Sequence, residues 1–266
     1  MKRRDFLKTS MAASALAGLS SAELGTAAES GGAASREYYE LRAYRLKAGA
    51  NHELLDAYLE KAAIPALNRF GVKRVGVFTE TNPKDGAKVY VLIPYSNLDT
   101  MVAVTARLNA DPECQKAGAD YLGSPKDNPA FDRIDSWLLL AFAGLPKLEL
   151  APYSLEKKPR MFELRTYESF SELKALKKVE MFNSGEIQVM REVGLAPVFY
   201  GQALVGRDLP HLTYMTSAES EDLHKQHWDV FGKHPVWNKL KNAPEYADTV
   251  SKITQRFLVP TECSQI

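Results

Sequence analysis

Two short stretches of the sequence place glutamate, arginine and tyrosine at alternate positions. They read Tyr39-Glu40-Leu41-Arg42-Ala43-Tyr44 and Phe162-Glu163-Leu164-Arg165-Thr166-Tyr167. An arginine can hold an anionic or carbonyl oxygen while a tyrosine hydroxyl donates a hydrogen bond beside it, and apolar pockets use a few such groups to orient a ligand. With a later His-Trp pair, they make up the candidate ligand-binding residues: Glu40, Arg42, Tyr44, Glu163, Arg165, Tyr167, His227 and Trp228. The sequence identifies no catalytic residue.

Four of the five histidines gather in the second half of the chain, at His211, His224, His227 and His234. Glu221, His224 and His227 recur at three-residue steps and so share one side of a helix, a spacing that could hold a transition metal. The same helix also carries an apolar stripe that includes His227, which is more simply explained as a packed side chain. The spacing of the histidines matches no established zinc signature. We therefore expect neither a metal nor another cofactor, and the residues to check for a metal are His224, His227 and His234.

The overall composition is that of an ordinary globular chain. Of its 266 residues, 45% are hydrophobic and 25% charged, and 34 Lys and Arg stand against 33 Asp and Glu, so the basic excess of nucleic-acid-binding proteins is missing. Two cysteines exclude a disulfide-stapled scaffold and a Cys-rich metal module. The sequence also lacks GxSxG, P-loop, GxGxxG and CxxC motifs, so hydrolase, nucleotide-binding and thioredoxin-like functions have no support. The partners that we expect are a small molecule and a second copy of the chain.

The first 28 residues are typical of a cleavable export signal. A charged start, MKRRDFLK, is followed by an Ala- and Ser-rich stretch that ends in small residues. The segment resembles the twin-arginine signal pattern, with Lys2 where that pattern usually has Ser or Thr. Serines and a glutamate interrupt the apolar part, which favours a cleaved signal over an anchor. We expect a signal peptide at residues 1–28, a periplasmic or exported protein, and no stable membrane insertion after cleavage.

The rest of the chain is an internal repeat. The stretch 39–44 returns at 162–167, an offset of 123 residues (162 minus 39), and the same offset aligns Ile64 with Ile187 and Gly71 with Gly194. Three prolines mark the segment between the halves as a linker. We expect a first repeat at residues 36–143, a linker at 144–159 and a second repeat at 160–260.

Each half is predicted to contain strand, helix, two strands, helix and strand. Short alternating runs of β-branched and aromatic residues predict the strands. Ser169-Phe-Ser-Glu172 predicts a capping box at the start of a helix that runs toward Gly194. Pro112 and Pro235 predict a break within the second helical region of each half, because proline lacks the backbone donor. The order βαββαβ, twice over, is the ferredoxin-like plan.

A four-stranded sheet with helices on one face needs a cover on the other. Side chains alternate along a strand, so Tyr39, Leu41 and Ala43 point one way and the Glu-Arg-Tyr set points the other. We expect the apolar set to face the helices. If the Glu-Arg-Tyr sets face the sheet of the other half, the halves close as one α/β barrel with polar clusters in its lumen. The alternative is a solvated cross-strand ladder of the same residues.

The repeated [YF]-E-L-R-x-Y strand, the glycine that ends each first helix, and the Trp228…His234-Pro235-x-Trp237 stretch resemble the NIPSNAP family. The resemblance covers residues 36 to about 260, twice over, and implies an α+β fold of tandem ferredoxin-like repeats, the dimeric α/β-barrel type. The family implies no agreed activity. Three functions remain open: binding of a small organic ligand in a barrel lumen, a non-catalytic protein-interaction module, and a cofactor-free monooxygenase-like or haem-handling enzyme.

Overall fold

The computed structural model describes residues 35–47 and 52–266, and the signal peptide expected at residues 1–28 lies outside them. Eight strands are described: β1 (Tyr38–Arg45), β2 (Gly76–Glu80), β3 (Lys88–Tyr95), β4 (Arg133–Ala141), β5 (Met161–Glu168), β6 (Ala196–Val205), β7 (His211–Ala218) and β8 (Lys252–Pro260). The helices before β5 are α1 (Glu53–Tyr58), η1 (Leu59–Ala63), α2 (Ile64–Arg69), α3 (Leu98–Ala110), α4 (Pro112–Ala117), α5 (Ala119–Leu122) and α6 (Pro152–Leu155). Those after it are α7 (Glu172–Met181), η2 (Phe182–Glu186), α8 (Ile187–Glu192), α9 (Glu221–Lys233), α10 (Pro235–Lys241) and η3 (Pro244–Tyr246). In this part of the chain, no helix has the length and apolar character needed to cross a membrane.

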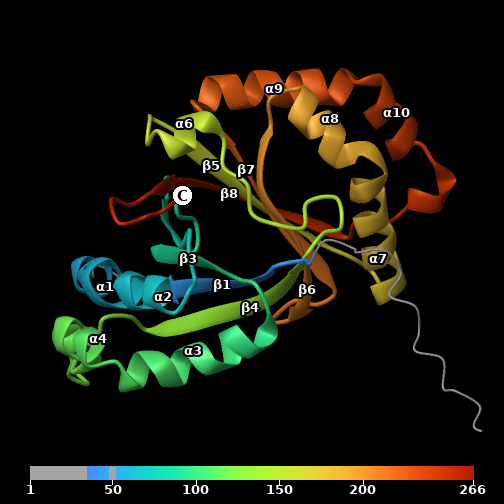
Figure 1. Cartoon of the computed structure of the whole chain (residues 1–266). Helices are drawn as coiled ribbons and strands as arrows, with labels where there is room; N and C mark the ends of the chain where they lie inside the picture. Colours follow the sequence, from blue (N-terminus) through green and yellow to red (C-terminus); the bar gives the residue numbers. More distant parts are fainter. Residues whose placement is uncertain (1–34, 48–51) are drawn as a thin grey trace, which may run out of the picture. The chain divides into compact units, whose positions relative to one another are not determined.

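The strands form one closed antiparallel barrel in the order β1-β3-β2-β8-β5-β7-β6-β4 (Figure 1). Each half contributes four neighbouring strands, and the halves join where β2 pairs with β8 and where β4 pairs with β6. The predicted fold class, tandem ferredoxin-like repeats of the dimeric α/β-barrel type, is therefore confirmed.

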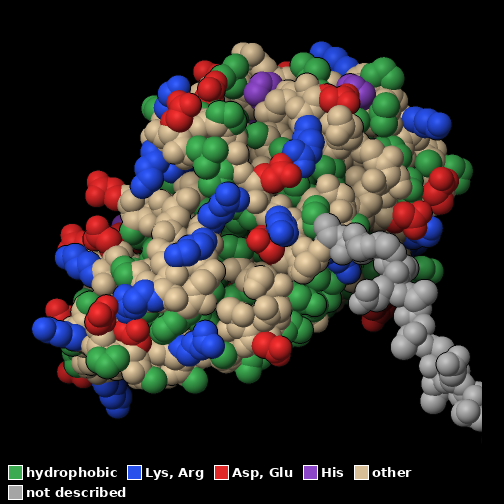
Figure 2. All heavy atoms as spheres, viewed as in Figure 1, with side chains coloured by type: hydrophobic (Ala, Val, Ile, Leu, Met, Phe, Trp, Pro, Cys, Tyr) green, Lys and Arg blue, Asp and Glu red, His purple; other side chains and the backbone are tan. Residues whose placement is uncertain are grey.

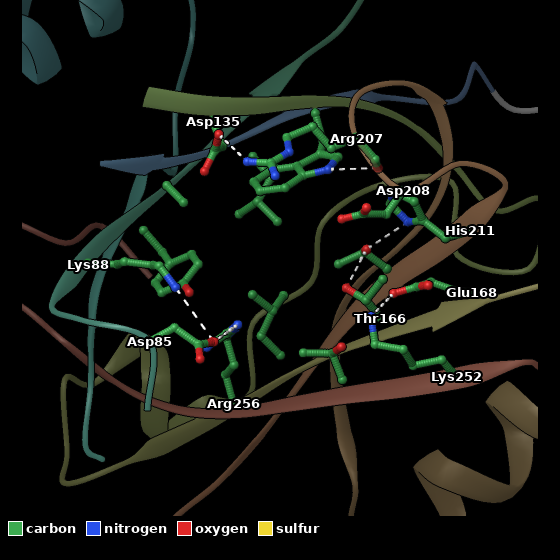
Figure 3. A pocket seen from close by; sticks show the side chains of 17 residues that line it. Asp85, Lys88, Asp135, Thr166, Glu168, Arg207, Asp208, His211, Lys252 and Arg256 are labelled. Atoms are coloured by element: carbon green, nitrogen blue, oxygen red, sulfur yellow. Dashed lines mark hydrogen bonds and ion pairs between the residues drawn. The ribbon is translucent and has the colours of Figure 1, made fainter. Parts of the chain in front are cut away.

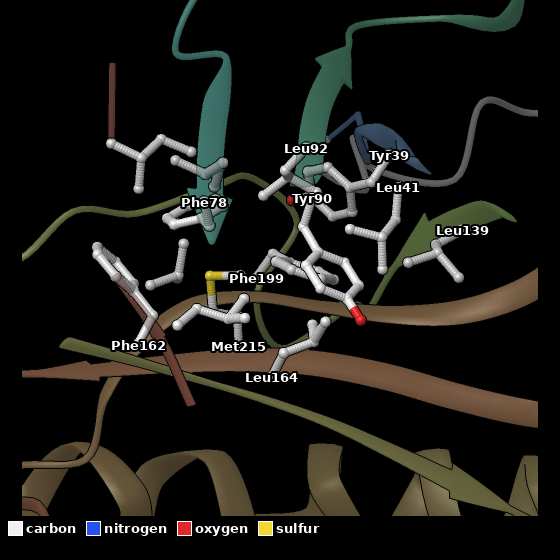
Figure 4. Packing of buried hydrophobic residues seen from close by; sticks show 14 of the residues in the cluster. Tyr39, Leu41, Phe78, Tyr90, Leu92, Leu139, Phe162, Leu164, Phe199 and Met215 are labelled. Carbon is white, nitrogen blue, oxygen red and sulfur yellow. The ribbon is translucent and has the colours of Figure 1, made fainter. Parts of the chain in front are cut away.

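The barrel interior is apolar over much of its length. In β1, Leu41 lies opposite Leu92 of β3 and Trp137 of β4, which places these three side chains on one face of the sheet. The interior cluster joins residues of both halves, as Figure 4 shows, and includes Tyr39, Leu41, Phe78, Leu92, Leu139, Phe162, Leu164, Phe199, Met215 and Leu258. Burial of these side chains from water holds the two halves together.

The expected orientation of the first strands was wrong. Tyr39, Leu41 and Ala43 face the barrel interior, whereas Tyr44 packs in the cluster beneath the helices of the first half. Alternation separates the two faces of a strand but does not say which face is inside. A closed barrel fills its interior with side chains from every strand, and here those are the apolar ones.

The helices of each half cover the outer face of its own four strands (Figure 1). Both predicted proline breaks are confirmed, because Pro112 begins α4 and Pro235 begins α10. The predicted capping box was wrong by two residues. Ser171, not Ser169, caps α7 by accepting a hydrogen bond from the Lys174 amide, while the Ser169 hydroxyl donates to the Thr249 carbonyl.

The surface mixes charges of both signs. On the face seen in Figure 2, lysine and arginine side chains lie among aspartates and glutamates, with apolar side chains scattered between them. This mixing matches the near-equal numbers of basic and acidic residues in the sequence.

Candidate functional site

A cavity of about 400 Å³ opens at one end of the barrel interior (Figure 3). Its inner wall is apolar and consists of Leu41, Ala43, Tyr90, Trp137 and Leu164. Its polar, uncharged part consists of Thr166, Thr213, Thr254 and His211. Its charged part consists of Asp85, Lys88, Asp135, Glu168, Arg207, Asp208, Lys252 and Arg256. We call this cavity the barrel mouth.

The barrel mouth lies where the inner face of the strands changes from apolar to polar. Along β5 the inward positions are Phe162, Leu164, Thr166 and Glu168. The facing positions of β8 are Leu258, Arg256, Thr254 and Lys252. The apolar core therefore ends partway along the barrel and leaves a space with hydrogen-bonding groups around it.

The charges that surround the barrel mouth are largely paired with one another. Lys252 Nζ lies 2.7 Å from a Glu168 oxygen, and an Arg207 nitrogen lies 3.0 Å from an Asp135 oxygen. Arg256 contacts Glu80 at 2.8 Å and Asp85 at 3.2 Å. The lining holds four basic and four acidic side chains, so their formal charges cancel.

His211 provides a neutral hydrogen-bonding group at the wall of the barrel mouth. Only 3% of the residue is exposed, and burial lowers the pKa of its imidazole, which keeps the ring uncharged at neutral pH. Its Nδ1 lies 3.3 Å from the Thr213 hydroxyl, which lies 2.9 Å from the Thr166 hydroxyl. This row of groups can donate or accept hydrogen bonds without adding charge.

None of the residues that line the barrel mouth is among the ligand-binding residues predicted from the sequence. The usable signal was the change from leucine to threonine to glutamate at every second position of residues 164–168. That signal has meaning only once the inward face of the strand is known.

The first predicted cluster, Glu40, Arg42 and Tyr44, lies beneath the helices of the first half and not in the lumen. Arg42 donates two hydrogen bonds to Glu40, at 2.6 and 2.9 Å, and lies 3.5 Å from the Tyr44 hydroxyl. Tyr95 and Ser136 also donate to Glu40. Burial alone would lower the pKa of Arg42, but the hydrogen bonds and charge of Glu40 outweigh it and leave that pKa raised. The structure therefore saturates this cluster internally.

The second predicted cluster lies beneath the helices of the other half. Glu163 is fully buried and accepts hydrogen bonds from His224 at 2.7 Å, from the Trp228 indole at 2.8 Å, and from the Gln255 amide. Burial alone would raise the pKa of Glu163, but the His224 hydrogen bond and the Arg165 charge outweigh it and leave that pKa lowered. Glu163 is therefore a buried carboxylate held in its ionised form.

The other predicted residues of the second half have separate partners. The Tyr167 hydroxyl lies 2.9 Å from the Tyr214 hydroxyl, and burial raises the pKa of Tyr167 to about 12. His227 packs against Gly194, where a Cβ atom would come within 2.8 Å of its ring. His234 caps α10 and lies 3.4 Å from Glu192.

The candidate metal ligands are not brought together. His224 hydrogen-bonds to Glu163, His227 packs against Gly194, and His234 lies beside Glu192. Across residues 35–47 and 52–266, no three His, Cys, Asp or Glu side chains are grouped to hold a metal ion.

Comparison with known proteins gives a family and a fold. The family model described as NIPSNAP matches residues 39–136 and 162–265. No curated protein matches the sequence significantly.

Several solved structures are similar. A Fusobacterium nucleatum protein provisionally named a monooxygenase has a TM-score of 0.54 at 10% identity, over 85% of this chain and 93% of that chain. A Lactobacillus acidophilus protein named in the same way has a TM-score of 0.55 at 10% identity, over 85% of this chain and 94% of that chain. A NIPSNAP family protein from Agrobacterium tumefaciens has a TM-score of 0.37 at 16% identity, over 45% of this chain and 96% of that chain.

Proposed function

The chain belongs to the NIPSNAP family, and from the geometry of its barrel we propose that it binds a small organic molecule in the barrel mouth. The observation that carries the proposal is the cavity of about 400 Å³, which has an apolar inner wall and polar groups around it. Ligand sites are typically concave, mostly apolar and about 300–1,000 Å³ in volume.

The lining indicates the class of ligand. Tyr90, Trp137 and Leu164 offer apolar contact to one part of a molecule, and the threonines and neutral His211 offer hydrogen bonds to another. Since the surrounding charges are balanced and paired, a neutral or zwitterionic molecule suits the site better than an ion of one sign.

The test is a substitution that fills the cavity, compared with a control on the same strand. Thr254 lines the barrel mouth, whereas the preceding residue, Ile253, points outward and is 51% exposed. The assay measures thermal stabilisation by benzyl alcohol, L-phenylalanine, benzoate and benzylamine, which share a ring and differ in charge. A ligand at about 100 times its Kd stabilises the folded state by about 2.7 kcal/mol.

We expect benzyl alcohol to stabilise the parent protein and the Ile253→Phe variant, but not Thr254→Phe, and L-phenylalanine to stabilise Thr254→Phe less than the parent. Native mass spectrometry of protein purified from its own cells would identify the physiological ligand. Equal stabilisation of the parent and Thr254→Phe by benzyl alcohol, or no stabilisation of the parent by benzyl alcohol or L-phenylalanine, would refute the proposal.

The two alternative functions have less support. The interaction-module hypothesis needs Trp228 and Trp237 as free aromatic anchors, yet both are partly buried against the helix-covered core of the second half. The monooxygenase-like alternative rests on the names of structures at 10% identity, and likeness at that level concerns fold alone.

Export remains a separate proposal, supported by the Arg3-Arg4 pair and the small-residue stretch that follows it. Changing both arginines to lysine should leave the precursor in the cytoplasmic fraction. Unchanged periplasmic recovery of that variant would contradict the twin-arginine route.

A further inference from the structure

The two copies of the E-L-R-x-Y motif use their arginines differently. In the first copy, Arg42 donates hydrogen bonds at 2.6 and 2.9 Å to Glu40. In the second copy, the nearest approach of Arg165 to Glu163 is 3.5 Å, which is an ion pair without a hydrogen bond. One motif therefore gives an arginine that is hydrogen-bonded to its glutamate in one half and an arginine without such a bond in the other.

Other side chains have taken the place of Arg165 on the carboxylate. Glu163 accepts from His224, Trp228 and Gln255. At the 123-residue offset, the first half has Met101 and Thr105 in place of His224 and Trp228. The second half thus has carboxylate partners on α9 that the first half lacks, and with these partners in place the guanidinium donors of Arg165 are unused.

Arg165 is enclosed but can be reached from solvent. Its side chain is 15% exposed, and its buried Nε atom has no hydrogen-bond partner. No side chain or carbonyl of residues 35–47 and 52–266 accepts a hydrogen bond from Arg165 within ordinary limits. A guanidinium keeps its charge at all relevant pH values and carries five donors, so this group is equipped to bind an acceptor from outside the chain.

The Arg165 guanidinium lies beside two aromatic rings. Its central carbon lies 4.5 Å from the ring centre of Trp228 and 5.5 Å from that of Tyr167. Trp228 is itself held by its hydrogen bond to Glu163, which fixes the position of its ring.

The charged side chains nearest to Arg165 are already paired with other groups. Lys178 lies 2.7 Å from Glu186, and both side chains are almost fully buried, so neither is free for a ligand. Glu163 is saturated by its three donors.

We propose that Arg165, beside the rings of Trp228 and Tyr167, forms a second binding site that takes the carboxylate group of an aromatic or aliphatic acid. The planar guanidinium matches a carboxylate through two parallel hydrogen bonds, and the partly exposed Trp228 ring offers contact to the apolar part of the acid. The site is on the outer face of β5 under α9, and the barrel mouth is on the inner face of the same strand. It is independent of the function proposed for the barrel mouth.

The test is a benzoate titration followed by tryptophan fluorescence, because Trp228 lies against the proposed site. Benzyl alcohol, which lacks the carboxylate, serves as the neutral probe, and ionic strength is held constant. We expect saturable benzoate binding to the parent protein. In Arg165→Gln the affinity should fall about tenfold to a hundredfold, as expected for loss of hydrogen bonds to a charged group.

Three variants make the result specific. Arg42→Gln changes the arginine of the first half, which is hydrogen-bonded to Glu40, and should leave the benzoate titration unchanged. Thr254→Phe fills the barrel mouth and should also leave it unchanged, so failure of one proposal is distinguishable from failure of the other. Arg165→Lys keeps the charge without the planar fork and should show weakened binding, which preserves the test if Arg165→Gln does not fold.

Equal benzoate affinity in the parent, Arg165→Gln and Arg165→Lys would overturn the proposal. So would equal affinity of Thr254→Phe, whose barrel mouth is filled, for benzoate and benzyl alcohol, since the site is argued from the carboxylate.

Discussion

The buried ion pair between Lys178 and Glu186 allows a quantitative test of the packing in the second half. Lys178 Nζ lies 2.7 Å from a Glu186 oxygen, and the two side chains are 5% and 2% exposed. Lys178 also lies 4.7 Å from the ring centre of Phe182. Replacing Lys178 with methionine keeps most of the side-chain volume and leaves the Glu186 carboxylate buried without its partner.

Breaking a buried pair in this way costs about 3–5 kcal/mol, because the remaining charge is uncompensated. In a protein of this size, 1 kcal/mol shifts the midpoint of thermal unfolding by about 2–4 °C, so we expect Lys178→Met to unfold about 6–20 °C lower. Lys177, the preceding residue, pairs with Glu180 on the helix surface at 2.8 Å. Lys177→Met is the matched control and should leave the midpoint nearly unchanged.

The stability difference between Lys178→Met and the parent should depend on pH. Burial raises the pKa of Glu186 above its ordinary value even beside Lys178. Without Lys178 this pKa rises further, so the folded variant binds a proton as the pH falls toward its folded pKa, and its stability relative to the parent recovers. Calorimetry from pH 8 to pH 5 would measure this, with Lys178→Met/Glu186→Gln as the variant that removes both charges.

Two results would refute the reasoning. One is a Lys178→Met midpoint within 2 °C of the Lys177→Met midpoint, which corresponds to less than about 1 kcal/mol. The other is a deficit that grows, rather than shrinks, as the pH is lowered.

Three further predictions concern the same half. Glu163→Gln should lower the free energy of unfolding most near neutral pH. The pKa of Glu163 in the folded state is below the ordinary value of 4.5, so the ionised carboxylate stabilises the fold fully above pH 4.5 and loses this effect as the pH falls through the folded pKa. Urea unfolding at several pH values should therefore show the stability difference between the parent and Glu163→Gln becoming smaller in acid. Tyr167→Phe should cost about 1–3 kcal/mol in urea unfolding, since the buried Tyr214 hydroxyl loses its partner; an unchanged midpoint would argue against that hydrogen bond. Ser171→Ala should cost about 1 kcal/mol through loss of the cap of α7, measured by the same unfolding curves, and no loss would place the helix start elsewhere.

Much of the architecture was predictable because it rests on local patterns. The 123-residue repeat, the alternating strands and the prolines at 112 and 235 act through neighbouring residues or through simple periodicity, and they predicted two βαββαβ units. The resemblance to the NIPSNAP family then implied the barrel that the structure confirms.

The candidate site was less predictable because it depends on contacts between distant residues. The sequence shows that Leu41 and Arg42 point to opposite faces of a strand, but only the pairing of β2 with β8 and of β4 with β6 closes the sheet and puts Leu41 inside. The partners of Glu163 are likewise decided by distance in space. His224 and Trp228 are 61 and 65 residues from Glu163 along the chain, yet they occupy its oxygens because α9 folds back over β5. A motif specifies which groups are present, and tertiary packing determines which of them are saturated and which remain able to bind a ligand.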